Sequence, residues 1–116
     1  MNKVLVCGDR NWTNYWIIYD VLSKLDKNII IIHGNARGAD IMAGTIASKL
    51  GMKVIPVPAE WEKYGKAAGV IRNRVMLDMK PNLVIAFHNN IERSKGTKDC
   101  VKEAQRRSIE VNIISV

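Results

Sequence analysis

Long apolar runs and paired cysteines are absent from this sequence. Cys7 and Cys100 stand alone, so there is neither a CxxC pair nor a disulfide framework, and both are expected to be small buried side chains. No apolar run approaches the roughly 20 residues that a membrane helix requires, and no amino-terminal basic and apolar signal occurs. We therefore expect a cytoplasmic protein without a membrane partner.

Patterns for metal and triphosphate binding are also missing. His33 and His88 follow two apolar runs with no acidic cluster nearby, which makes a poor metal site, so no metal is assigned. The stretch "SKGTKD" (94–99) lacks the full GxxxxGK[ST] pattern of a Walker loop. Linkers, repeats and low-complexity tracts are absent, so residues 1–116 are predicted to form one domain.

Acidic residues are too few to balance the basic ones. Eighteen lysines and arginines stand against eleven aspartates and glutamates, which gives a formal charge of +7. This excess favours an anionic partner such as a nucleotide, a nucleic acid or a phosphorylated metabolite. A basic protein without such a partner fits the composition equally well.

Short β-branched runs alternate with helix-like segments along the chain. The runs are typical of strands that are covered on both faces, and they lie at 3–8, 28–34, 53–58, 82–88 and 110–116. The clearest helix is 38–51, where an apolar stripe from Ala39 to Leu50 ends at Gly51. The alternation predicts an α/β fold: a single Rossmann-like, doubly wound domain with a five-stranded, mainly parallel sheet and helices on both faces.

Ligands of such sheets bind at the carboxyl ends of the strands, so the turns after the strands are the candidate site. In "HGNARGAD" (33–40), Gly34 permits a sharp turn, Gly38 permits close approach to a helix start, and Arg37 adds a forked donor. Asp40 is expected either to cap backbone donors or to hold a ribose hydroxyl. An ordinary tight turn explains the same spacing.

Two further stretches have similar alternatives. In 94–99, Ser94 and Thr97 are candidate caps, and together with Lys95 and Gly96 they resemble a phosphate-binding turn. The alternative is an ordinary helix start. In "RNR" (72–74), one arginine is expected to face a ligand and the other solvent or a carboxylate, unless both are surface residues. Lys98, Lys102 and Arg106 form a basic row that acids accompany, which indicates a solvated face.

Aromatic residues in the turns have two readings. Trp12, Trp61 and Tyr64 are each able to stack on a base or to close the core, and the core role is favoured for Trp61. The predicted ligand contacts along this rim are Gly8, Asp9, Arg10, Trp12, Gly34, Asn35, Arg37, Gly38, Asp40, Arg72, Asn73, Arg74, His88, Ser94, Lys95, Gly96 and Thr97.

Together, "VCGDRNW", "IIHGNARGAD", "PAEWEKYGKAAGVIRNRVML", "LVIAFH" and "SKGTKDCV" resemble the YspA-type branch of the SLOG superfamily over essentially the whole chain. The resemblance implies a Rossmann-like fold and a nucleotide-derived ligand, and such proteins occur in bacteria and phages. Its relatives include Lonely Guy enzymes, ADP-ribose or NAD sensor domains, and the DNA-processing protein A family. The "G-x-ARG-x-D" and "RNR" stretches are similar to that last family and imply phosphate contacts at Gly34, Arg37, Gly38, Arg72 and Arg74.

One departure weakens the enzymatic expectation. Lonely Guy enzymes carry PGGxGTxxE, whereas Cys100 stands here at the glutamate position. Asp99 is one residue away, which on a helix turns the side chain by about 100°. We therefore do not extend the Lonely Guy reaction to this chain.

Three hypotheses follow. The first is binding of an NAD-, ADP-ribose- or nucleoside-monophosphate-like ligand by a sensor or sequestering module, possible as a homodimer, with no cofactor assigned. The second is an N-glycosidic hydrolase of the phosphoribohydrolase type that uses Asp9, Glu60 or Asp99. The third is single-stranded nucleic-acid binding, which the charge supports.

Overall fold

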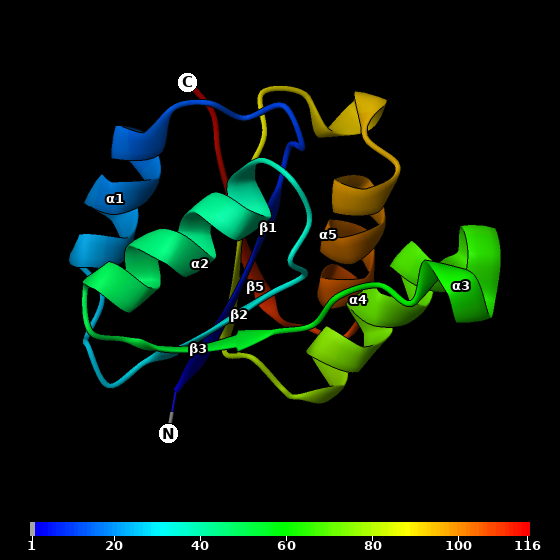
Figure 1. Ribbon diagram of the computed structural model, residues 1–116, viewed down its shortest axis with the longest axis horizontal. Helices are drawn as coiled ribbons and strands as arrows, with labels where there is room; N and C mark the ends of the chain where they lie inside the picture. Colours follow the sequence, from blue (N-terminus) through cyan, green and yellow to red (C-terminus); the bar gives the residue numbers. More distant parts are fainter. Residues whose placement is uncertain (1) are drawn as a thin grey trace.

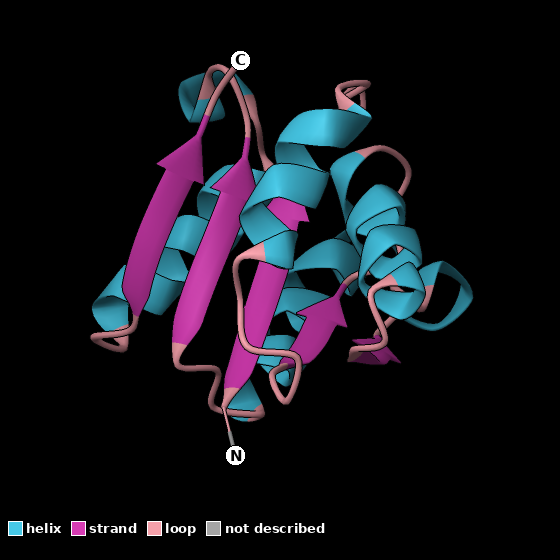
Figure 2. Cartoon of the chain, turned by 90° about the vertical axis from the view of Figure 1, so that its left-hand side faces the viewer, coloured by secondary structure: helices cyan, strands magenta, loops and turns pink. Residues whose placement is uncertain are grey.

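Five parallel strands form the centre of the molecule. The computed structural model describes residues 2–116, and its strands are β1 (Lys3–Gly8), β2 (Ile30–His33), β3 (Lys53–Pro56), β4 (Leu83–Phe87) and β5 (Glu110–Ile114). Their order across the sheet is β3-β2-β1-β4-β5, and every neighbouring pair is parallel (Figure 2). This confirms the predicted doubly wound α/β fold.

Helices connect the strands and cover both faces of the sheet (Figure 1). Four of these helices are long: α1 (Tyr15–Ser23), α2 (Ala39–Lys49), α4 (Ala68–Asp78) and α5 (Gly96–Arg106). Of these, α2 matches the predicted helix 38–51 to within two residues at each end. Three short elements lie in the loops: α3 (Trp61–Tyr64), η1 (Gly65–Ala67) and η2 (Ile91–Arg93).

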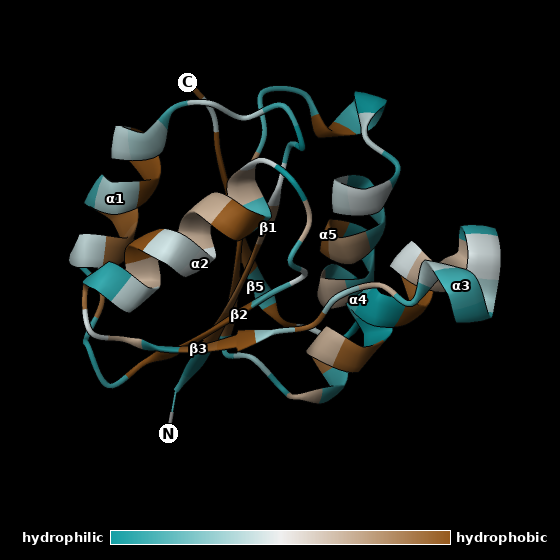
Figure 3. Ribbon diagram, in the orientation of Figure 1, coloured by the Kyte–Doolittle hydropathy of each residue, from teal (hydrophilic) through white to brown (hydrophobic). Residues whose placement is uncertain are grey.

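Alternating strand residues divide the core into two halves. Val4 and Val6 of β1 pack with α1 and α2, whereas Leu5 and Cys7 of the same strand pack with α4 and α5. The period of two in a strand sends successive side chains to opposite faces, so a strand of consecutive apolar residues fills both halves. Figure 3 shows this apolar centre between more hydrophilic loops.

The predicted stripe of 38–51 is confirmed as the buried face of α2. Ala39, Ala43, Ile46 and Ala47 are fully buried, and Leu50 packs at their margin. Gly51 follows with a positive φ of 81°, the conformation that commonly ends a helix. Within residues 2–116, none of the helices has the length and apolar character that crossing a membrane requires.

Candidate functional site

The strand order reverses direction between β1 and β4, and the loops after these two strands meet at the carboxyl edge of the sheet. The backbone N–H of Asp9 donates to the carbonyl oxygen of Phe87 across 2.8 Å. A β-carbon on Gly8 would lie 2.4 Å from that same oxygen, so the close approach of the two strand ends requires glycine there. Open α/β sheets bind their ligands at this kind of position.

A buried carboxylate organises the turn after β2. Oδ2 of Asp40 accepts a hydrogen bond from the N–H of Gly34 at 3.0 Å, and the Asp40 side chain is buried. Burial raises the pKa of Asp40 to about 6, although Arg72 and backbone N–H groups of Gly34, Ala36 and Gly8 act in the opposite direction. Of the two roles expected for Asp40, the structure shows the capping of backbone donors.

Arg72 closes the same turn from the other side. Its Nη1 donates to the carbonyl oxygen of Gly34 at 2.6 Å, and its Nε donates to Oδ1 of Asn73 at 3.1 Å. A β-carbon on Gly34 would lie 2.5 Å from Nη1 of Arg72 and 2.8 Å from Oδ2 of Asp40. The guanidinium and the carboxylate therefore occupy the space that a side chain at position 34 would need.

The loop after β1 covers the start of α2. Gly38 has a φ of 85°, and a β-carbon there would lie 2.4 Å from the carbonyl oxygen of Asp9. The N–H of Ala39 donates to that oxygen at 3.1 Å. Contact with the Asp9–Arg10 backbone thus explains Gly38, and its predicted contact with a ligand remains a prediction.

Arg37 lies exposed on the turn after β2, and two hydrogen bonds orient its side chain. Its Nε donates to the carbonyl oxygen of Arg10 at 3.3 Å, and its Nη2 donates to Oδ1 of Asn11 at 3.1 Å. These bonds direct the guanidinium along the β1–α1 loop while solvent still reaches it. Arg37 is therefore a cation at the carboxyl edge that no carboxylate neutralises within the described residues.

The turn before α5 is more open. Oγ of Ser94 accepts from the N–H of Thr97 at 3.0 Å, which confirms Ser94 as a cap. A β-carbon on Gly96 would meet no atom within 4 Å. Beside this turn lies a hollow of about 530 Å³, which is lined by Val70, Glu92, Arg93, Ser94, Lys95, Lys98, Asp99 and Lys102.

One residue of α4 joins the two turns. Nδ2 of Asn73 donates to the carbonyl oxygen of Gly96 at 3.2 Å and to Oδ2 of Asp99 at 3.0 Å, and its Oδ1 accepts from Arg72. The Asn73 side chain is buried, so these bonds are shielded from water. Arg72 and Asn73 consequently hold the Gly34 turn and the Gly96 turn at one edge of the sheet.

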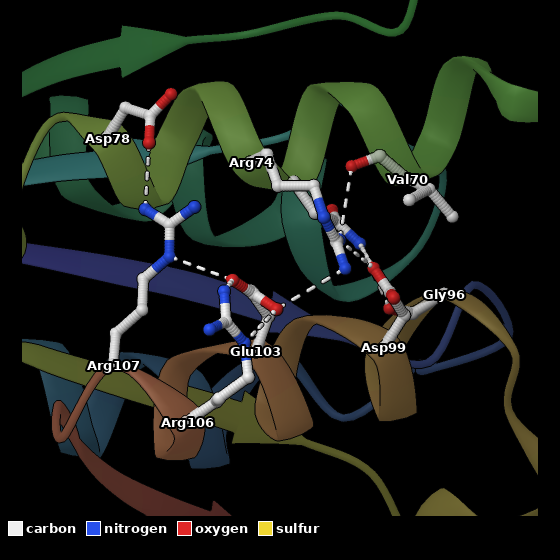
Figure 4. Close-up of polar contacts among 9 residues, drawn as sticks. Val70, Arg74, Asp78, Gly96, Asp99, Glu103, Arg106 and Arg107 are labelled. Atoms are coloured by element: carbon white, nitrogen blue, oxygen red, sulfur yellow. Dashed lines mark hydrogen bonds and ion pairs between the residues drawn. The ribbon is translucent and has the colours of Figure 1, made fainter.

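Arg74 points from α4 toward the acidic residues of α5, as Figure 4 shows. Its Nη1 donates to Oδ2 of Asp99 at 2.9 Å, and its Nη2 lies 3.4 Å from Oε1 of Glu103. Arg106 and Arg107 bind the same Glu103 carboxylate, which lowers the pKa of Glu103 to about 2. The expectation that one arginine of "RNR" faces a carboxylate is confirmed for Arg74, and this pairing argues against its predicted phosphate contact.

The burial of Trp12 and Trp61 is the reverse of what the sequence led us to expect. Trp12 is buried, its ring lies 5.7 Å from that of Phe87, and its Nε1 donates to the carbonyl oxygen of Asn14 at 2.8 Å. Its assignment as a ligand contact is corrected, because the ring is part of the core. Trp61, for which the core role was favoured, is 59% exposed.

The two histidines have the same local role at different strand ends. Nδ1 of His33 accepts from the N–H of Asn35 at 3.1 Å, and Nδ1 of His88 accepts from that of Asn90 at 2.9 Å. His33 is buried against Gly44, where a β-carbon would lie 2.5 Å from the ring, and burial lowers the pKa of His33. Among residues 2–116, no group of three or more potential metal ligands occurs.

The three candidate catalytic acids lie on three different elements. Asp9 accepts from the N–H of Asn11 at 2.9 Å, Asp99 is paired with Arg74, and Glu60 is exposed directly before α3. No hydrogen bond found in the described part of the chain joins two of these carboxylates. Their predicted catalytic role remains a prediction.

Comparison with known proteins identifies the family. A model of the YspA, cpYpsA-related SLOG family matches residues 2–64. The chain belongs to this family. Gene 61 protein of Mycobacterium phage D29 is 36% identical to this SLOG-family chain over 120 residues, which cover 96% of the chain and 94% of the phage protein.

A solved structure supports the fold of this SLOG-family chain. It is the X-ray structure of DNA processing protein A (DprA) from Streptococcus pneumoniae, with a TM-score of 0.81 and 20% sequence identity. The match covers 97% of this chain and only 50% of the DprA chain, so the chain spans half the length of that protein. At this identity the likeness shows a shared fold.

Proposed function

We propose that the protein binds a nucleotide-derived anion at the carboxyl edge of its sheet. The observation that carries the proposal is the pairing of Arg72 with Gly34 and of Asn73 with Gly96, which brings two glycine-bearing turns to one edge. Membership of the SLOG family supports a nucleotide-related ligand. We propose further that the ligand is an NAD-, ADP-ribose- or nucleoside-monophosphate-like molecule and that the protein acts as a sensor or sequestering module.

The distribution of charge at this edge supports an anion. Asp40 is buried among backbone donors, and Asp99 is paired with Arg74, so neither presents a free negative charge to a ligand. Arg37 and Lys95 are exposed, and they lie on the two turns. Cations that are oriented before binding attract phosphate at little cost in side-chain entropy.

Calorimetry tests the proposal. NAD, ADP-ribose, AMP and a cyclic nucleotide are titrated into the wild-type protein and into the Arg37→Ala variant. The expected result is saturable binding of at least one of them, which Arg37→Ala weakens about tenfold, since a charge-assisted contact contributes roughly 1.5 kcal/mol.

Lys53→Ala is the matched control, because it removes one exposed positive charge from the opposite end of a strand. The Lys53→Ala variant should bind each ligand with the affinity of the wild-type protein. Heats at background level for all four ligands would contradict the proposal.

Single-stranded nucleic acid is a second candidate, and the fold shared with DNA processing protein A favours it. The formal charge of +7 is compatible with such a partner. Contact with several phosphates would make the logarithm of affinity fall steeply with the logarithm of salt concentration. A fluorescence titration with an oligonucleotide at several salt concentrations distinguishes the candidates, because a mononucleotide site predicts a shallow slope.

A further inference from the structure

Trp61 is an exposed indole next to the arginine that closes the Gly34 turn. Its Cη2 lies 3.5 Å from the position of a β-carbon on Gly69, and Nη2 of Arg72 lies 4.0 Å from the same position. Nη1 of Arg72 meanwhile donates to Gly34. The indole, the guanidinium and the turn after β2 therefore come together although they belong to different elements.

The segment that carries Trp61 contributes nothing to the core. Every residue from Glu60 to Ala67 is exposed, and α3 extends from the side of the molecule (Figure 1). Burying an indole would remove a large apolar area from water, yet 59% of Trp61 remains accessible. The core therefore gives no reason for tryptophan at this position.

A planar ligand with a negative charge fits a site formed by the Trp61 indole and the Arg72 guanidinium. An exposed indole offers a face on which a nucleobase stacks, and a guanidinium offers donors to a phosphate or a ribose oxygen. A sugar phosphate lacks a planar aromatic ring and would gain no base stacking from the indole. The combination thus favours a ligand that carries a base.

We infer that Trp61 is the base-stacking residue of the ligand site and that it selects nucleotides over sugar phosphates. This inference rests on the proposed function, because it concerns the same carboxyl edge. Arg37 and the Gly96 turn bind the anionic part of the ligand, and α3 supplies the surface for the base. Trp61 therefore determines the preference for a ligand with a base, whereas the anionic part of the ligand binds without contact to Trp61.

The test compares two ligands on matched variants. AMP carries a base and ribose 5-phosphate does not, so calorimetry with both separates stacking from phosphate contact. Trp61→Ala should weaken AMP about tenfold or more, since stacking on an aromatic side chain contributes roughly 1–3 kcal/mol per base. Its affinity for ribose 5-phosphate should stay at the wild-type value, and Trp61→Phe should recover most of the AMP affinity.

Trp16→Ala is the control, because Trp16 is 70% exposed and lies on α1, which covers the opposite face of the sheet. It should bind AMP as the wild type does. Both alanine variants should melt at the wild-type temperature, because neither indole is buried.

Three outcomes would overturn the inference. AMP affinity that is unchanged in Trp61→Ala, an equal loss for both ligands, or an equal loss in Trp16→Ala would each do so. If Arg37→Ala still weakens AMP in those cases, the proposed function survives without the stacking residue. If the wild-type protein binds no nucleotide, the proposed function itself fails and the inference with it.

Discussion

The two glycine-bearing turns at the carboxyl edge look alike in sequence and differ in what surrounds their glycines. Around Gly34 and Gly38, the Asp40 carboxylate, the Arg72 guanidinium and the Asp9 backbone fill the space in which a β-carbon would lie. Around Gly96, the same space is empty to 4 Å. The first turn needs glycine for packing within the protein, whereas the second leaves room for another molecule.

This difference assigns separate tasks to the two turns. The Gly34 turn is a rigid support that fixes Arg37 beside the β1–α1 loop. The Gly96 turn is held from behind by Asn73 and is open toward solvent beside Lys95. Ligand contacts are therefore expected from Arg37 on the first turn and from the backbone and Lys95 on the second.

Alanine at the glycines gives the largest expected effect. Gly38→Ala should lower the free energy of unfolding by about 3–5 kcal/mol, because it combines a positive φ with a clash against backbone. Gly51→Ala has a similar φ and no neighbour within 4 Å, so it should cost only about 1 kcal/mol. Gly96→Ala should change stability by less than about 0.5 kcal/mol.

Urea denaturation of the three variants checks this order. The difference between Gly38→Ala and Gly51→Ala measures the clash with the Asp9–Arg10 backbone together with the effect of the ψ of −128° at Gly38. Equal losses at positions 38 and 96 would show that the contrast between the two turns is wrong.

The buried carboxylate of the first turn gives a pH dependence. Folded Asp40 keeps its proton up to a pKa of about 6, and the unfolded chain releases it near 3.8. Between these values the folded state binds more protons, so the Asp40 contribution to stability falls as pH rises, by roughly 3 kcal/mol in total. Unfolding free energies at pH 4–6 should show this decline in the wild type relative to Asp40→Asn, and parallel profiles would contradict it.

Glu103 gives the opposite sign in a lower window. Its folded pKa of about 2 lies below the usual 4.5, so its contribution is present above pH 4.5 and is lost as pH falls toward 2. Replacing Arg106 and Arg107 together by glutamine should raise the Glu103 pKa, since these two side chains are its main hydrogen-bond donors. Side-chain NMR titration of Glu103 would show the rise, and an unchanged midpoint would argue against this ion-pair network.

Arg74→Ala should loosen the second turn selectively. It removes the contacts of Arg74 with Asp99 and Glu103, and a loss of about 1–2 kcal/mol is expected for these partly buried ion pairs. Hydrogen exchange should accelerate at Gly96–Cys100 and remain slow around Gly34. Faster exchange at both turns would mean that they form one cooperative unit.

Lys95→Ala has the smallest expected effect, and only on binding. The exposed ammonium group should contribute about 1 kcal/mol to phosphate binding, which is a roughly fivefold change in affinity without loss of stability. Calorimetry with AMP measures it, and Lys27→Ala serves as a control because Lys27 is exposed in the turn before β2. Equal affinities of the two variants would remove Lys95 from the site.

The fold could be predicted from the sequence because the patterns that indicate its strands and helices each lie within one short segment. Consecutive apolar residues in β1, β2 and β4 and the stripe of α2 are properties of single segments, and each was placed to within a few residues. The short α3 lacks such a period, and no buried residue anchors it, so it was not foreseen.

The roles within the site depended on contacts between distant segments. Composition could not show whether a glycine makes room for a ligand or, as Gly38 does, for residues 9 and 10 of the same chain. The exchanged burial of Trp12 and Trp61 has the same cause, because a loop position does not reveal which ring reaches Phe87. The link through Asn73 had no signal beyond the "RNR" stretch itself.

An NMR titration locates the ligand on the protein. ADP-ribose, NAD and AMP, together with a cyclic nucleotide, are added in turn to ¹⁵N-labelled protein, and every backbone amide and indole N–H signal is followed. For at least one ligand, we expect shifts concentrated at Arg37, Gly38, Lys95–Lys98 and the Trp61 indole. Shifts confined to the amino edge of the sheet, around Leu77, Lys80 and Ile109, or an absence of shifts with all four ligands, would contradict a binding site at the carboxyl edge.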